Sequence, residues 1–522
     1  MPAGWKNRIA DAKCALMSFV RENKAFFLWM LLFSSVVYFR LMAEELVNCY
    51  DGIWENSYHQ AGAWELSLGR WFWLYIDRLR LGVSSDPMAS LMSLVSYSLG
   101  LTLFASLFGN KSSFSKYLAG GLFLCSQSVL VTLSYRYMSP TFGTAFLLGM
   151  LGIWICAKTK NFVLGMAAGS ICICLSLGAY QAFIGCICLA FAGWMIMKAK
   201  EGEANVLSLL AKGAGAIFLG GLEYLAVWNL HLWFFHVEKS SYAGADGYSL
   251  LNMLVRFPKR AIDVFSCFGL YFKGIICKNL YFGGVWLYLL FFVLAAALLA
   301  VDIWAAFKVK KLNGVISLLM ATVFPLAAGA VLLMATDTGL SVQMTGAYAL
   351  VIPLLLLLQA AGEKRKAPVR LLRAGTSFVA LVILYASFLQ VQVDQKTMSE
   401  TKASSMNVVR EIHGRLGAEG LLSEDLEYCF IGVPAGNPMY YRSETFWEAN
   451  GYAYIGGGWP DPASVTKSWR GLVREICQIN MNICTAGEYD MLSQNEVVAN
   501  MPLFPAEGSI VRIGDVVVIK VS

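Results

Sequence analysis

The sequence predicts an all-α, polytopic membrane protein with a small α/β domain at its C-terminal end. Two features of the composition indicate this class: of 522 residues, 57% are hydrophobic and only 14% are charged, against a usual charged share of about 25% in soluble domains. The third observation is the presence of long uncharged runs, such as 283–301 and 347–358, because crossing the hydrocarbon takes about 20 residues of helix. A soluble metabolic enzyme is therefore excluded.

Apolar runs of helical length predict about eleven membrane crossings. The expected spans are 25–42, 88–108, 117–133, 140–157, 162–180, 182–197, 206–228, 284–307, 314–334, 347–361 and 374–391. The two runs that meet at 178–181 also fit a single re-entrant feature, which would change the parity.

Basic residues fall in every second connection between these runs. The basic connections hold Lys6, Arg8, Lys13, Arg21 and Lys24, then Lys111 and Lys116, Lys158 and Lys160, Lys198 and Lys200, Lys308, Lys310 and Lys311, and Lys364, Arg365, Lys366, Arg370 and Arg373. Since cytoplasmic loops are enriched in Lys and Arg, this pattern predicts a cytoplasmic N-terminus, and an odd number of crossings puts the tail outside. The net charge of +7 is thus spread over the connections, and no nucleic-acid partner is expected.

The chain is expected to divide into a transmembrane domain, 1–391, and an extracytoplasmic domain, 392–522. Two long loops of the first domain, 43–87 and 229–283, should also lie on the outer face. In the tail, Ser509–Val521 alternates like a strand, while Met406–Leu416 and Thr466–Ile479 show helical periodicity. These patterns are typical of a small α/β domain.

The first outer loop contains an amphipathic segment. From Trp64 to Leu79, one helical sector carries apolar residues and the other carries mostly charged ones. The apolar residues are Trp64, Leu68, Trp71, Phe72, Tyr75 and Leu79. The segment is predicted to be one helix lying flat on the membrane surface.

Two patches of sequence resemble a known family. The string Tyr50, Asp51, Gly52, with Trp64, Glu65 and then Leu68, Gly69, Arg70, Trp71, resembles the first outer loop of the bacterial Gtr-type membrane glucosyltransferases, which add glucose to O-antigen and related surface glycans. The stretch Gln390–Arg415, with Asp394, Gln395, Glu400, Ala403 and Arg410, resembles that family's segment after the last membrane helix. The resemblance implies a GT-C-like fold in the bacterial cell membrane. It also implies a polyprenyl-phosphate glucose donor and an extracytoplasmic glycan acceptor.

Transfer of a sugar to a hydroxyl group needs a carboxylate base near the acceptor and a cation near the departing phosphate. Asp51 is the first candidate for the base, and Glu44 and Glu45 are alternatives. Arg70 is favoured for the phosphate, because a guanidinium can make a bidentate contact. The other expected substrate-binding residues are Glu65, Trp71, Arg136, Arg256, Lys259 and Arg260. The last four also fit contacts with the headgroups of membrane lipids.

Some chemistries are not expected. The sequence has neither an Asp-x-Asp metal motif nor a glycine-rich phosphate loop, so a lipid-linked donor is favoured over a nucleotide sugar, and no cofactor is expected. His231 and His236 are five residues apart and face different sides of a helix, so no metal site is expected there. Cys477 and Cys484 fit either a disulfide or two free thiols.

The alternative function is transport or flipping of a lipid-linked sugar. Such a protein would carry ionisable groups at mid-membrane depth. Most predicted spans have none there, and Glu223 and Asp302 are the exceptions.

Overall fold

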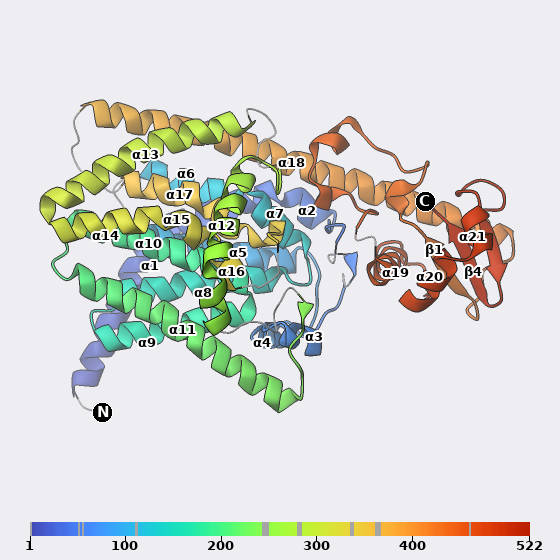
Figure 1. Cartoon of the computed structure of the whole chain (residues 1–522), viewed down its shortest axis with the longest axis horizontal. Coiled ribbons are helices and arrows are strands. Elements are labelled where there is room, and N and C mark those ends of the chain that lie inside the picture. Colours follow the sequence, from blue (N-terminus) through green and yellow to red (C-terminus); the bar gives the residue numbers. More distant parts are fainter. Residues whose placement is uncertain are drawn as a thin grey trace.

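The protein is a helical bundle with a small sheet-containing domain at one end (Figure 1). The computed structural model describes residues 3–50, 53–54, 57–109, 113–242, 250–278, 284–334, 339–360, 367–458 and 461–522. Asp51, the first candidate for the base, lies outside these described residues. Most of the described residues are helical, so the predicted helical class is confirmed.

Eight helices within the described residues are long and apolar enough to cross a membrane. They are α5 (Met88–Ser106), α8 (Ser139–Lys158), α9 (Phe162–Ala179), the short 3-10 turn Gln181–Phe183 with α10 (Ile184–Glu201), α11 (Val206–Phe235), α13 (Gly284–Val309), the turn Val342–Met344 with α17 (Gly346–Ala360), and α18 (Ala367–Ala418). A ninth is formed if α6 (Ser113–Leu124) and α7 (Gln127–Ser134), which are bent by 47°, count as one span. The chain is a multi-pass membrane protein.

Besides 117–133, which is the bent pair α6 and α7, two of the eleven predicted spans do not form one continuous apolar helix. Span 25–42 covers the end of α1 (Ala3–Val37) and α2 (Phe39–Ala43), with a break at Tyr38, whose hydroxyl group donates to the carbonyl oxygen of Leu124. Span 314–334 is divided into α14 (Lys311–Thr322), α15 (Phe324–Ala328) and α16 (Ala330–Met334). Pro325 at the start of α15 has no N–H to continue the hydrogen bonding of α14. Within the described residues, eight or nine helices thus meet the requirement for a span, so the count of eleven is not confirmed.

The amphipathic segment 64–79 is not the single helix that its periodicity predicts. It forms α3 (Ala63–Ser67) and α4 (Trp73–Leu79), separated by a turn at Gly69. Gly69 has φ +83°, and a Cβ there would lie 2.2 Å from the Tyr224 hydroxyl oxygen. The turn is therefore set by α11, more than 150 positions later in the chain, and Leu68 and Trp71 are buried instead of facing lipid.

One helix of the second long loop, 229–283, runs across the bundle. α12 (Leu250–Phe272) stands roughly at right angles to the long axis of the bundle in Figure 1. Val264 is buried against the bundle, whereas Val255 and Ile262 are more than two-thirds exposed. An exposed apolar edge on a helix with this orientation is typical of a helix at the membrane surface.

The C-terminal domain is reached along α18, which continues far past the apolar part of the helix. The predicted separate helix 406–416 is the end of α18. The four-stranded sheet has the order β2–β1–β4–β3, with β1 parallel to both neighbours and β3 antiparallel to β4. The strands are β1 (Glu427–Ile431), β2 (Asn482–Ile483), β3 (Ile510–Ile513) and β4 (Val516–Lys520), and the helices are α19 (Pro462–Arg470), α20 (Ala486–Ser493) and α21 (Glu496–Asn500).

Two local predictions for this domain need correction. The run 509–521, predicted as one strand, is a hairpin of β3 and β4, because Gly514 turns the chain at φ +64°. The predicted helix 466–479 starts earlier, as α19, and continues as a π-helical turn, Gly471–Ile476. Cys477 and Cys484 are both free thiols.

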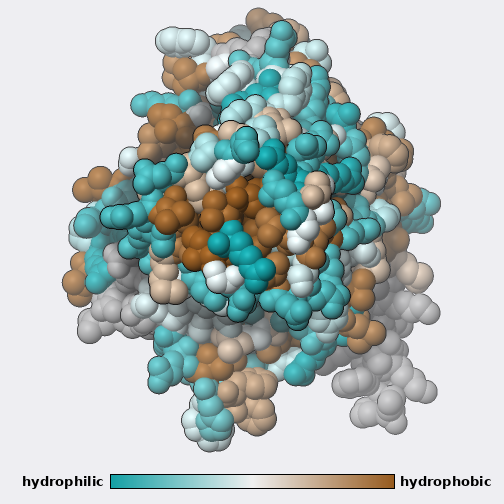
Figure 2. Space-filling view, turned by 90° about the vertical axis from the view of Figure 1, so that its right-hand side faces the viewer, coloured by the Kyte–Doolittle hydropathy of each residue, from teal (hydrophilic) through white to brown (hydrophobic). Residues whose placement is uncertain are grey.

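Figure 2, which faces the end bearing the C-terminal domain, shows mostly hydrophilic side chains around a hydrophobic patch.

A buried carboxylate attaches the C-terminal domain to α18. Asp394 is completely buried and accepts hydrogen bonds from Gln390 Nε2 at 3.1 Å and from both the backbone and the side-chain nitrogen of Asn450 at 2.9 Å. The hydroxyl group of Tyr452 also donates to it. Asn450 in turn accepts from the backbone nitrogen of Lys278 at 2.6 Å, so the same cluster fixes the connection after α12.

Replacing Asp394 should loosen this attachment. Asp394→Ala leaves several buried donors without an acceptor, and each costs about 1–3 kcal/mol. We expect faster proteolytic cleavage of the 437–458 segment than in the unmodified protein, measured by limited proteolysis in detergent. Glu411→Ala, on the exposed face of the same helix, is the control. Equal cleavage rates in all three proteins would show that Asp394 does not hold the domain.

Candidate active site

A cavity of about 530 Å³ lies between the first outer loop and the C-terminal domain. This volume is within the range of small-molecule sites, roughly 300–1,000 Å³. Aromatic rings form much of its wall, and charged and polar groups come from both sides. The lining residues are Trp54, His59, Trp64, Glu65, Leu68, Arg70, Trp73, Tyr135, Tyr137, Met138, Phe142, Tyr180, Tyr242, Gln343, Asp461, Ser464 and Lys467.

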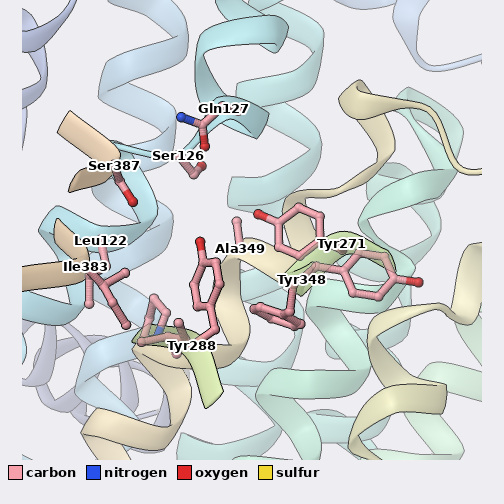
Figure 3. A pocket seen from close by; sticks show the side chains of 12 residues that line it. Leu122, Ser126, Gln127, Tyr271, Tyr288, Tyr348, Ala349, Ile383 and Ser387 are labelled. Atoms are coloured by element: carbon pink, nitrogen blue, oxygen red, sulfur yellow. The ribbon is translucent and has the colours of Figure 1, made fainter. Parts of the chain in front are cut away.

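Other hollows suit a polar substrate less well. The one in Figure 3, among Tyr271, Tyr288, Tyr348 and Gln127, has a volume of about 20 Å³, which is room for about one water molecule. A groove of about 610 Å³ along α5 is mainly apolar, with Met88, Leu91 and Met92 in its wall. A third, of about 490 Å³, lies near the start of α18, away from the C-terminal domain.

Arg70 enters the cavity from the turn between α3 and α4. The turn is held by Gln181, whose Nε2 donates to the carbonyl oxygen of Leu68 at 2.7 Å, and by Trp228, whose Nε1 donates to the carbonyl oxygen of Leu66 at 2.7 Å. The guanidinium carbon lies 5.1 Å from the ring centroid of Tyr180 and 6.0 Å from that of Trp73.

The charge of Arg70 has no counter-ion among the described residues. The side chain is half-buried and makes neither an ion pair nor a hydrogen bond with any of them, and its Nε is buried without a partner. A guanidinium stacked on aromatic rings, with its donors unused, is well suited to binding a phosphate.

Glu65 is a largely buried carboxylate in the same cavity. It sits in the first turn of α3, where its Oε2 accepts from the backbone nitrogen of Gly62 at 2.7 Å. Its Oε1 lies 3.6 Å from Nε2 of His59, and the same nitrogen lies 3.8 Å from Oδ2 of Asp77. His59 also packs against the rings of Trp73 and Tyr137. The carboxylate and the imidazole are thus held on one wall by packing and hydrogen bonds.

Asp77 and Arg80 support this wall from behind. Arg80 donates to Oδ1 of Asp77 from both Nε and Nη2, at 2.9 and 2.8 Å, and also to the carbonyl oxygen of Tyr137. Burial raises the pKa of Asp77 above its usual value, although Arg80 opposes the shift. Because both side chains are buried, the pair is structural and fixes the loop next to the cavity.

The cavity belongs to a region that matches a known family. A family model described as Glucosyl transferase GtrII matches residues 55–358, more than half of the chain. The chain belongs to the GtrII glucosyltransferase family. No curated protein matches it.

The GtrII region contains one side of the cavity only. Glu65, Arg70 and Tyr180 lie within 55–358, whereas Asp461, Ser464 and Lys467 lie beyond it. The Arg70 wall therefore lies in the region that the family model matches, and the α19 wall lies outside that region.

The structure places most of the other predicted site residues away from the cavity lining. Glu44 pairs with Arg40 at 3.1 Å on the surface, and Glu45 pairs with Arg136 at 2.7 Å. Trp71 is buried under Gly178, where a Cβ would lie 2.5 Å from its ring, and stacks on His231. These residues hold the outer loop together.

The predicted basic residues of α12 are also outside the cavity lining. Arg256 and Lys259 are exposed, and Arg260 lies 3.3 Å from Asp263. Their place on a helix across the bundle suits contacts with lipid headgroups. Of the nine predicted site residues that the structure describes, Arg70 and Glu65 line the cavity.

Sequence reasoning missed several residues of the cavity. His59 belongs to no motif in the sequence, and Tyr180 lies in the short break 178–181 between two apolar runs. The polar residues Asp461, Ser464 and Lys467 recur every three positions, which could have marked one face of a helix. Which cavity that face lines depends on the tertiary structure, and the sequence carries no signal for it.

Proposed function

We propose that this GtrII glucosyltransferase takes glucose from a polyprenyl phosphate and transfers it to an extracytoplasmic glycan in the cavity between the first outer loop and the C-terminal domain. The observation that supports it most is the presence, in one aromatic-walled cavity, of a carboxylate, Glu65, and of a guanidinium, Arg70, that has no ion-pair partner in the part of the chain that the structure describes. Membership of the family supports the sugar and the reaction class.

In the proposed reaction, a hydroxyl group of the acceptor attacks C1 of the glucose. The bond between C1 and the phosphate oxygen breaks, and polyprenyl phosphate leaves. Arg70 stabilises the negative charge that develops on the phosphate, and a carboxylate of the first outer loop takes the proton of the hydroxyl group. Asp51 remains the base proposed from the sequence, and Glu65 is the carboxylate that lines the cavity. The reaction needs no cofactor.

We further propose a GT-C-like architecture in a bacterial cell membrane, with a cytoplasmic N-terminus. The connection from α13 to α14 and the start of α18, both rich in basic residues, lie at the end of the bundle opposite the C-terminal domain (Figure 1). By the positive-inside rule this end faces the cytoplasm. Domain 392–522 and the cavity then face the outside, on the same side as a surface glycan.

Transport of a lipid-linked sugar is the alternative. The family assignment favours transfer, and the two ionisable groups predicted at membrane depth have local partners: Glu223 accepts from the Ser170 hydroxyl at 2.9 Å, and Asp302 lies 3.2 Å from Nζ of Lys200. Pairing of this kind suits a structural role in the bundle.

A transfer assay tests the proposal. Purified protein in lipid nanodiscs is incubated with radiolabelled polyprenyl-phosphate glucose and with oligosaccharides released by mild acid from the cell envelope of the source organism. We expect label in the oligosaccharide fraction, and none when a nucleotide-activated glucose replaces the lipid donor. Movement of labelled lipid across vesicle membranes, without transfer to any oligosaccharide, would support the flippase instead.

A further inference from the structure

One face of α19 forms a polar wall of the cavity. Asp461, at the N-cap of the helix, Ser464 and Lys467 are spaced by three residues and therefore share a helical face. All three line the cavity that also contains Arg70 and Glu65. The C-terminal domain thus contributes directly to the site, from a part of the chain outside the GtrII match.

The position of α19 is fixed by close contacts with the first outer loop. Trp54 Nε1 donates to the Ser468 hydroxyl oxygen at 3.0 Å, and the Ser57 hydroxyl donates to Glu475 at 2.6 Å. At Gly471 the two backbones approach so closely that a Cβ would lie 2.1 Å from the carbonyl oxygen of Ile53. The wall is therefore held in place by the first outer loop.

The chemistry of this wall differs from that of the Arg70 wall. Asp461 caps α19 by accepting from the backbone nitrogen of Ser464 at 3.0 Å. Hydrogen bonds from Ser464 hold the pKa of Asp461 below its usual value, so it is ionised at neutral pH. Lys467 Nζ lies 4.8 Å from the ring centroid of Trp54. The wall offers a carboxylate that accepts hydrogen bonds, an ammonium group that donates them and an aromatic ring beside them.

These groups fit a saccharide better than a phosphate. Sugar hydroxyl groups both donate and accept hydrogen bonds, so they can bind a carboxylate and an ammonium group at once, while an aromatic ring packs against the C–H face of the sugar. For an anionic phosphate, the charges of Asp461 and Lys467 offset each other on the α19 wall, whereas Arg70 attracts it. The two walls therefore suit the two substrates of a transfer reaction.

We propose that the α19 face formed by Asp461, Ser464 and Lys467 is the acceptor subsite, which binds the glycan that receives the glucose. This inference rests on the proposed function and extends it, because it assigns acceptor choice to the C-terminal domain. The catalytic groups and the groups that select the acceptor then lie in separate parts of the chain.

The test uses Asp461→Asn and Lys467→Gln in the full-length protein. Asparagine also caps helices well, so the first change removes the charge and keeps the helix. With the oligosaccharides described above, we expect the KM for the acceptor to rise about tenfold or more, as for loss of a hydrogen bond to a charged group. The KM for the lipid donor should stay within about twofold. Arg470→Gln, at the exposed C-terminal end of α19 and outside the cavity lining, is the matched control and should match the unmodified protein.

Calorimetry of the same oligosaccharides with donor-free protein gives a readout that needs no chemistry. Weaker binding by Asp461→Asn, with no effect of Arg470→Gln, supports the subsite even if no transfer occurs, in which case only the proposed function fails. An increase in the KM for the lipid donor in Lys467→Gln would show that Lys467 binds the phosphate, and it would overturn the proposal. Unchanged acceptor binding and acceptor KM in both α19 variants would overturn it as well.

Discussion

Arg70→Ala is expected to lower kcat for glucose transfer by about 10²–10³-fold, the usual cost of removing one donor that stabilises transition-state charge. The side chain has no ion-pair partner to lose among the described residues, so the fold should survive the change. Arg70→Lys should recover part of the rate, because the charge remains while the planar fork that stacks on Tyr180 is lost. Initial rates with radiolabelled lipid donor measure the effect.

The matched control for this prediction is Arg78→Ala. Arg78 lies on α4 close to the same turn, but it is exposed and stacks on Tyr75 rather than lining the cavity. Its removal should change kcat less than twofold. A rate for Arg70→Ala equal to that for Arg78→Ala would mean that the phosphate is bound elsewhere.

Removing the general base should have an effect at least as large. We expect either Asp51→Asn or Glu65→Gln to lower kcat by about 10²–10⁴-fold, the usual contribution of acid–base catalysis, and the other to have a smaller effect. Glutamine at position 65 keeps an oxygen for the backbone nitrogen of Gly62, so the start of α3 should stay intact. Stopped-time assays at several pH values measure kcat for each variant.

The loss of the base has a second signature. In the variant that lacks the base, the fall in rate on the acidic side of the pH profile should disappear, because that fall reports protonation of the carboxylate. Glu44→Gln, which breaks only a surface ion pair with Arg40, should keep both the rate and the profile. Full activity in both Asp51→Asn and Glu65→Gln would exclude a base from these two positions.

The sequence predicts the membrane helices well because their signal is local. Each predicted span requires only an apolar run, and most of the runs become single helices. The run 25–42 fails because of a long-range contact, since Tyr38 is bonded to the backbone at position 124, whereas 314–334 is interrupted locally at Pro325. The turn at Gly69, which is packed against Tyr224, also has a long-range cause. For the same reason, the periodicity of 64–79 correctly indicates helix but misses the turn that directs Arg70 into the cavity.

The candidate site is predictable in part, for a related reason. Arg70 and Glu65 stand in a short string that resembles a known family, so their importance can be inferred before the fold is known. His59 and Tyr180 join them only through the tertiary structure. The α19 residues lie about 400 positions after Arg70, and nothing local indicates that Ser468 bonds to Trp54. A cavity built from such distant segments is visible only in three dimensions.

In the proposed reaction, the lipid-linked sugar binds with its phosphate at Arg70. The most direct measurement is a cryo-electron microscopy structure of the protein in nanodiscs with a non-cleavable polyprenyl-phosphonate glucose. The predicted result is phosphonate density within hydrogen-bonding distance of the Arg70 guanidinium and glucose density inside the cavity, between Tyr180 and α19. Phosphonate density at the groove along α5, or at the hollow near the start of α18, with the Arg70 cavity empty, would show that the phosphate of the donor binds elsewhere.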